Sequence, residues 1–201
     1  MTVVQFVPNL NSGGVERGTL EIAQALVAAG HRSHVASNGG RLVDILESQG
    51  STHHHWPLHR KSPTTLLRAL ALRRWLEKLQ PDIVHVRSRM PAWIVWLAWR
   101  GMNPATRPRL ITTLHGLHSV SWYSKIMGRG ELVIAVSQTA KQYLIDHCNV
   151  PQESIRVIYR GTDPAEFPRN YQPSDTWLAK WRADLPQLQG KRIIALPGRL
   201  S

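Results

Sequence analysis

Short β-rich runs alternate with longer helical patterns along most of this chain of 201 residues. Seven runs have the composition of strands, at 3–7, 33–37, 53–56, 83–87, 110–115, 132–136 and 156–159. Six helical patterns lie between them, at 15–29, 42–49, 64–79, 92–99, 121–127 and 138–147. Because such connections are right-handed, we expect a Rossmann-like α/β fold, a doubly wound parallel sheet covered on both faces. The expected strand order is third, second, first, fourth, fifth, sixth, seventh.

Single residues predict where several of the helices begin or end. Gly30 is placed to end the first helix, and Ser137 is a candidate N-cap for the sixth. Pro91 is placed where a proline opens a helix at its first position.

Ligands of such sheets bind at the carboxyl ends of the strands, near the switch in strand order. This rule selects the loops at 9–14, 88–90, 116–118, 137 and 160–163. Gly13 and Gly14 stand where the first strand passes into a helix, so a ligand could approach the backbone and the free amides of the helix start. The spacing differs from a dinucleotide fingerprint and no Walker lysine follows, so a purely structural tight turn is the alternative.

Cationic and imidazole side chains follow the fourth and fifth strands. Arg87 and Arg89 could clamp a phosphate or a carboxylate, or could be a solvated pair. His115 could hydrogen-bond a sugar hydroxyl or a developing charge, or could be a structural histidine. Gly116 permits a sharp turn between His115 and His118.

Two further patterns suggest functions that we regard as weaker. Three consecutive histidines, His53 to His55, suggest zinc, but neighbouring strand side chains point to opposite faces, so no metal is expected. The basic helix around Arg73 and Arg74 suggests nucleic acid or a membrane surface, whereas a solvated face is the simpler account.

The charge balance favours anionic partners. The chain carries 25 Lys+Arg against 13 Asp+Glu, a formal net charge of +12.

Cys148 is the single cysteine, so an intrachain disulfide is impossible. No signal peptide is apparent, and the apolar window 92–99 is far shorter than the roughly 20 residues that span a bilayer. These features predict a cytoplasmic protein.

The composition changes after Asp163. We expect a domain over 1–163, a proline-rich linker over 164–190 with a short helix near 177–182, and then a new strand at 192–196. An apolar strand cannot bury itself alone, so residues 191–201 would be the first strand of a second domain.

Five segments, in this order and spacing, resemble glycosyltransferase family 4: "PNLNSGGVERGTLEIAQALVAAGH", "PDIVHVRSRMPAW", "LITTLHG", "VIAVSQTAKQYL" and "IRVIYRGTD". The resemblance implies two Rossmann-like domains facing across a cleft, the arrangement called GT-B. It also implies transfer of a sugar from a nucleotide-sugar to a glycan or lipid-linked acceptor, with retention of anomeric configuration and without metal or other cofactor. The N-terminal domain would mainly hold the acceptor.

The resemblance also assigns roles to single residues. Gly13 and Gly14 would lie against the donor diphosphate or the acceptor, and His115 would lie beside the transferred sugar. Arg199 would pair with the donor diphosphate. Arg160 replaces the asparagine of the family's turn that continues to Asp163. Arg87 and Arg89 match a subset with anionic acceptors, such as lipopolysaccharide core sugars.

Two other classes of function remain open from the residues. One is a basic Rossmann-like module that binds phosphorylated ligands without catalysis, and the other is a nucleic-acid binder, which only the charge suggests. If the protein is a transferase, we expect it to dock on an anionic membrane. This expectation rests on the net charge, the cationic third helix and a group of tryptophans, Trp93, Trp96 and Trp99. The alternative is that these tryptophans are buried against the sheet.

Overall fold

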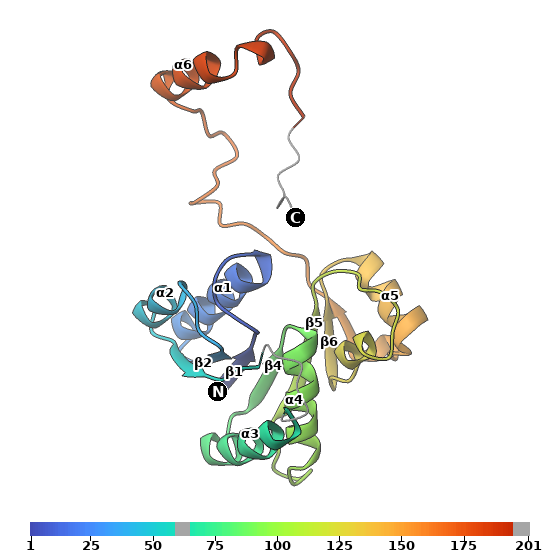
Figure 1. Ribbon diagram of the computed structural model, residues 1–201. Helices are drawn as coiled ribbons and strands as arrows, with labels where there is room; N and C mark the ends of the chain where they lie inside the picture. The colour runs from blue at the N-terminus through green and yellow to red at the C-terminus, as the bar shows by residue number, and fades with distance from the viewer. Residues whose placement is uncertain (59–64, 195–201) are drawn as a thin grey trace. The chain divides into compact units, whose positions relative to one another are not determined.

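The computed structural model describes residues 1–58 and 65–194 (Figure 1). The chain divides into two compact units, Met1–Arg160 and the part that begins at Gly161. The division falls three residues before the boundary expected after Asp163.

The first unit is built on a seven-stranded sheet. Its strands are β1 (Thr2–Phe6), β2 (Arg32–Ser37), β3 (Thr52–His55), β4 (Ile83–Val86), β5 (Arg109–Leu114), β6 (Leu132–Ala135) and β7 (Ile155–Val157). Every neighbouring pair is parallel, and the order is β3-β2-β1-β4-β5-β6-β7. The predicted fold class and strand order are confirmed. The switch in strand order therefore lies between β1 and β4.

Helices connect the strands as the alternation predicts. They are α1 (Gly14–Ala28), α2 (Val43–Ser48), α3 (Thr65–Leu79), α4 (Arg89–Arg100) and α5 (Gln138–Cys148), with short 3-10 turns η1 (Ser124–Gly128) and η2 (Gln152–Ser154). Ser137 caps α5 as expected, since its side chain accepts a hydrogen bond from Ala140 N. The helix expected at 121–127 is instead the 3-10 turn η1.

The start of α4 differs from the prediction. Ser88 is the N-cap and Arg89 the first helical residue, so Pro91 is the third residue of the helix rather than the first. The amides of the first turn have no partner within the helix, so a proline costs no hydrogen bond at either position.

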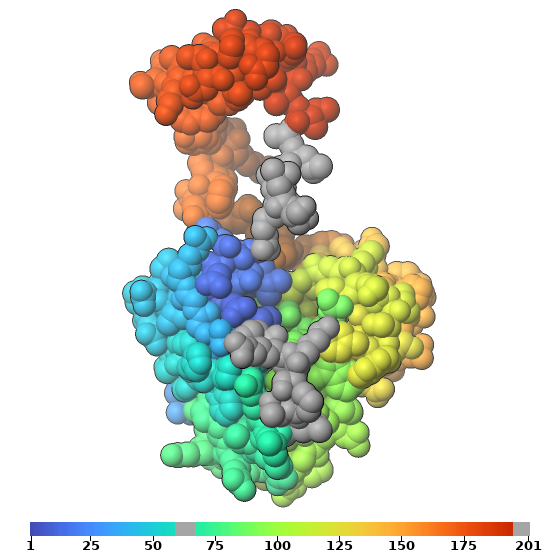
Figure 2. Space-filling view, in the orientation of Figure 1, coloured from blue at the N-terminus to red at the C-terminus, as the bar shows by residue number. Residues whose placement is uncertain are grey.

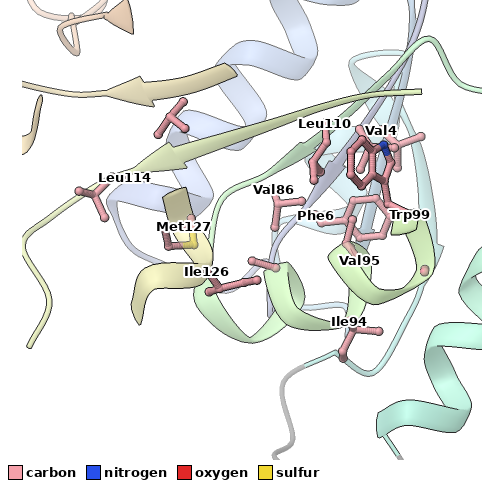
Figure 3. Close-up of a cluster of buried hydrophobic side chains, with 14 of the residues drawn as sticks. Val4, Phe6, Val86, Ile94, Val95, Trp99, Leu110, Leu114, Ile126 and Met127 are labelled. Carbon is pink, nitrogen blue, oxygen red and sulfur yellow. The ribbon is translucent and has the colours of Figure 1, made fainter. Parts of the chain in front are cut away.

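The main core lies between one face of the sheet and α3, α4, η1 and α5. In Figure 3, Phe6, Val86 and Leu110 from the strands meet Val95 and Trp99 from α4. A smaller cluster joins the other face to α1 and α2, formed by Val7, Leu10, Ala23, Val35 and Leu46 with partly buried neighbours. The sheet is thus covered by helices on both faces (Figure 1).

The tryptophans of α4 belong to this packing. Trp99 exposes only 7% of its surface and donates from Nε1 to the carbonyl oxygen of Pro108 at 2.7 Å. Trp93 and Trp96 are partly buried against the core. The structure supports burial against the sheet for this cluster rather than exposure at headgroup depth.

The second unit is described by itself. It contains α6 (Asp175–Asp184), which Ser174 caps by accepting from Trp177 N, followed by the 3-10 turn η3 (Pro186–Leu188). The predicted short helix is therefore present. Residues 191–194 have no regular structure, and the rest of the expected 192–196 strand lies outside the described residues. A first strand of a further domain remains a prediction.

Candidate functional site at the carboxyl edge of the sheet

The Gly13-Gly14 turn joins β1 to α1 at the switch in strand order. Gly13 is the N-cap of α1 with φ 134°, a backbone conformation that only glycine adopts readily, and Gly14 is the first helical residue. The preceding loop is held against the turn after β2, because Leu10 N donates to Gly39 O and Asn38 N to Pro8 O. The turn therefore presents the free amides of the α1 N-terminus at the carboxyl edge.

Two arginines approach α1 one turn further along the helix. A Cβ built on Gly18 would lie 2.8 Å from Arg160 Nη2 and 3.0 Å from Arg87 Nη2. A Cβ on Gly14 would lie 3.2 Å from Arg160 Nη1. Gly14 and Gly18 thus make room for guanidinium groups that come from the ends of β4 and β7.

Arg87 is a buried cation with few protein partners. The residue exposes only 4% of its surface. Its Nη1 donates to Gln5 Oε1 at 3.2 Å, and Gln5 in turn donates to Thr19 O at 3.1 Å. Its Nε has no hydrogen-bond partner in the described part of the chain. Burial, and then the charge of Arg160, lower the pKa of Arg87 to about 10, so the group stays charged at neutral pH.

His115 follows β5 and faces the same charges. Neither of its buried ring nitrogens, Nδ1 or Nε2, has a partner among residues 1–58 and 65–194. Burial, and then the charges of Arg87, Arg160 and His118, lower the pKa of His115 to about 3. The imidazole is therefore neutral at pH 7 and offers one donor and one acceptor to a ligand.

A polar layer beneath α1 connects these residues, and the sequence analysis did not identify it. His85 of β4 is buried and shares a hydrogen bond of 2.7 Å with Thr113 Oγ1 of β5. Burial, and then Arg87 and His115, lower the pKa of His85 to about 3. His85 and Arg87 are two residues apart along the chain, and Gln5 of β1 is the register partner of His85. The signal was therefore polar residues on one face of apolar strands.

Arg89 has other partners. It donates from Nη1 to Ser124 Oγ at 3.2 Å, and its guanidinium lies 5.5 Å from the ring centre of Tyr123. The geometry favours Arg160 rather than Arg89 as the companion of Arg87. His118 lies on the loop between β5 and η1, where its carbonyl oxygen accepts a hydrogen bond from Tyr143 Oη at 2.9 Å.

Two expected site residues, Asp163 and Arg199, do not belong to the first unit. Asp163 belongs to the second unit, is exposed, and accepts from Ala165 N at 2.8 Å. Arg199 lies outside the described residues, so its role stays a prediction.

The histidine run does not form a cluster. His53 shares a hydrogen bond of 2.8 Å with Ser37 Oγ, and His54 one of 3.0 Å with His34. No group of three His, Cys, Asp or Glu in the described ranges is arranged to hold a metal ion. None of the described helices is long and apolar enough to cross a membrane.

Comparison with known proteins agrees with the fold. The family model described as Glycosyltransferase Family 4 matches residues 12–166. A glycosyltransferase structure from Rickettsia africae ESF-5 is 36% identical with a TM-score of 0.74, covering 92% of this chain and 49% of that one. No protein with a curated description matches.

Two more distant structures share the fold. Alr3699/HepE of Anabaena, in complex with UDP and glucose, is 19% identical with a TM-score of 0.68, covering 91% of this chain and 50% of that one. The lipopolysaccharide outer core galactosyltransferase WaaB in its apo form is 12% identical with a TM-score of 0.65, covering 81% of this chain and 46% of that one.

The sheet and its helices match the N-terminal domain of GT-B glycosyltransferases. The chain belongs to glycosyltransferase family 4. It spans about half the length of each of these three structures.

Proposed function

We propose that the protein transfers a sugar from a nucleotide-sugar to a glycan or lipid-linked acceptor, with retention of anomeric configuration. Family membership supports the class of reaction. We place the reaction at this site because the two buried ring nitrogens of His115 have no hydrogen-bond partner in the described chain. A buried polar group without a partner is costly, so this imidazole is placed to meet a ligand.

The proposed chemistry needs a neutral hydrogen-bonding group and nearby positive charge. The bond between the anomeric carbon and the diphosphate oxygen breaks, a bond to the acceptor oxygen forms, and the hydroxyl proton of the acceptor passes to the departing diphosphate oxygen. His115 can donate to or accept from a sugar hydroxyl beside that carbon. The diphosphate leaves with negative charge, which cations of this edge can stabilise.

We propose that catalysis also requires groups outside residues 1–201. The matched structures are about twice as long, and transfer requires donor and acceptor to be held together. The test is sugar release and transfer by the complete natural protein and by residues 1–201 alone. Activity of the complete protein only is expected, whereas robust transfer by residues 1–201 would refute this division of labour.

The printed ligands of the fold neighbours suggest substrates to test first. UDP and glucose are bound in the Anabaena structure, and WaaB is a lipopolysaccharide galactosyltransferase. We therefore propose UDP-sugars as first donors and a role in lipopolysaccharide or other cell-surface polysaccharide synthesis.

We further propose a cytoplasmic enzyme that attaches reversibly to anionic membranes. The support is an exposed face of α3, which lies on the surface of the first unit (Figure 2). Leu67 and Leu70 expose 69% and 58% of their surfaces, and the exposed Arg74 and Lys78 continue that face at helical spacing. The face thus combines apolar side chains with cations, as attachment to anionic lipid requires.

A second exposed apolar segment lies between β5 and η1, yellow to yellow-green in Figure 2. Leu117, Val120 and Trp122 are exposed, Trp122 by 73%. The segment is held in place because Tyr143 Oη donates to His118 O and Trp93 Nε1 to Tyr123 O. These side chains follow His115 directly, so they could contact the apolar part of a lipid-linked acceptor.

A further inference from the structure

We propose that Arg87 and Arg160, together with the first turn of α1, form a binding site for one phosphate or carboxylate group of the substrate. That the group belongs to a sugar substrate rests on the proposed function, whereas binding of the anion itself does not.

The first argument is convergence. Nη2 of Arg87 and Nη2 of Arg160 both lie within 3.0 Å of one point, the position that a Cβ would take on Gly18. The two nitrogens are therefore separated by no more than twice that distance. Two donors at such a separation can both reach the oxygens of one oxyanion.

The second argument is uncompensated charge. In residues 1–58 and 65–194, neither arginine forms an ion pair with a carboxylate. Glu21 is the acid whose field reaches Arg87, and it is itself paired with Arg17 at 3.5 Å. Two like charges held together without a counterion are unfavourable in the free protein, and an anion would remove that cost.

The third argument is unused donor capacity on a buried group. Arginine carries five N–H donors in a fixed plane. Arg87 is almost completely buried, yet Gln5 is its one hydrogen-bonding partner in the described chain, and its Nε has none. A role that was only structural would satisfy more of these donors. The amides of the first turn of α1 add further donors on the same helix.

Gly14 and Gly18 complete the site by leaving space. Any side chain at Gly18 would enter the volume in which both guanidinium groups end. The backbone at Gly18 does not have a positive φ, so its glycine is explained by this close approach rather than by conformation.

Two sources could supply the group: the diphosphate of the donor, or an acidic substituent of the acceptor. Isothermal titration of the full chain with pyrophosphate, UDP, glucose 6-phosphate and glucuronate tests both, with uridine and glucose as uncharged counterparts. Arg160→Gln is the main variant because Arg160 is exposed and its loss should not unfold the protein. Arg32→Gln is the charge-matched control, since Arg32 is exposed at the amino end of β2.

We expect saturable binding of at least one anion, weakened about tenfold or more by Arg160→Gln and by less than about twofold by Arg32→Gln. If Arg160→Gln loses affinity only for pyrophosphate and UDP, the site binds the donor diphosphate. If it loses affinity only for glucose 6-phosphate or glucuronate, the site binds an acidic acceptor. Both results support the site. Arg87→Lys, which keeps the charge but loses the planar fork, should also weaken binding.

Equal effects of Arg160→Gln and Arg32→Gln, or no saturable binding of any anion, would overturn the proposal. The result is distinguishable from failure of the proposed function. Anion binding without any sugar transfer would refute the transferase and leave the site standing. Sugar transfer with unaltered kinetics in Arg160→Gln would refute the site and leave the transferase standing.

Discussion

Arg160 and Arg87 meet at Gly18, where a single Cβ would lie within 3.0 Å of a nitrogen from each guanidinium group. One arginine follows the central strand β4 and the other follows the edge strand β7. The fold thus brings two cations together at the carboxyl edge, and neither is paired with a carboxylate of the described residues. This relationship has consequences for stability as well as for binding.

Arg160→Gln should stabilise the free protein. The substitution removes a like charge near Arg87, and because Arg160 is exposed the gain should be about 0.5 kcal/mol in the free energy of unfolding. Urea denaturation at low salt measures it against Arg32→Gln. The gain should disappear at high salt because the repulsion is screened. A destabilised Arg160→Gln protein would show that the pair is held by contacts that stabilise it.

The buried histidines should make the protein sensitive to acid. His85 has a pKa of about 3 in the folded chain against 6.5 as its ordinary value, because burial disfavours the imidazolium. Between these values the unfolded chain binds the proton and the folded chain does not. Stability should therefore fall by up to about 1.4 kcal/mol per pH unit as pH drops below 6.5.

His85→Gln tests this assignment, since the glutamine amide can replace the ring nitrogen that meets Thr113. Urea denaturation from pH 7 to pH 4 should show a shallower loss of stability in His85→Gln than in the wild type. His31→Gln, a change between α1 and β2, is the control and should follow the wild type. Identical slopes in all three proteins would mean that His85 does not contribute to the acid sensitivity.

Two neighbouring glycines, Gly39 and Gly40, lie against the loop that leads to the Gly13-Gly14 turn. Substitution by alanine should destabilise the protein to different extents at the two positions. Both have positive φ, 87° at Gly39 and 141° at Gly40. A Cβ on Gly39 meets nothing within 4 Å, whereas one on Gly40 would lie 2.5 Å from Leu10 O. Gly39→Ala should cost about 1 kcal/mol and Gly40→Ala about 3 kcal/mol or more. Equal losses in urea denaturation would show that conformation alone decides both positions.

The α3 face should bind anionic vesicles. Each basic residue near such a surface contributes about 1 kcal/mol, and the attraction decays within a Debye length. Co-sedimentation should show binding to anionic but not neutral vesicles, lost by roughly 0.5 M salt. Replacing Leu67 and Leu70 by Ser should weaken this binding, and Ile45→Ser, a control at an exposed residue of α2, should not. Binding to neither vesicle would leave no support for membrane attachment.

The sequence predicted the parallel sheet, its strand order and most helices, because these depend on local periodicity and on the handedness of crossovers. It also predicted the edge at which Gly13, Arg87 and His115 lie, since parallel strands end together. It did not predict that Arg160, rather than Arg89, accompanies Arg87. That pairing depends on side-chain direction: Arg89 begins α4 and turns to Ser124, whereas Arg87 stays on the sheet face beneath α1.

Burial was the other quantity that the sequence left open. The sequence analysis did not identify Gln5, His85 and Arg87 as residues of one face, and only the packing of α1 shows that this face is covered. The tryptophans of α4 were equally ambiguous, because an amphipathic pattern does not state which side faces the sheet. Trp99 is buried there, whereas Trp122, between β5 and η1, is exposed.

The most direct test of the account is sugar transfer by the complete natural protein, comparing wild type with His115→Ala. Nucleoside diphosphate release from UDP-sugars, and label transfer to a lipid and glycan extract, would be followed with His31→Ala as the matched control. We expect wild-type and His31→Ala activity to be similar and His115→Ala turnover to fall by about a hundredfold, with an unchanged urea midpoint. Wild-type turnover in a folded His115→Ala protein would contradict the assignment of this edge as the site of transfer.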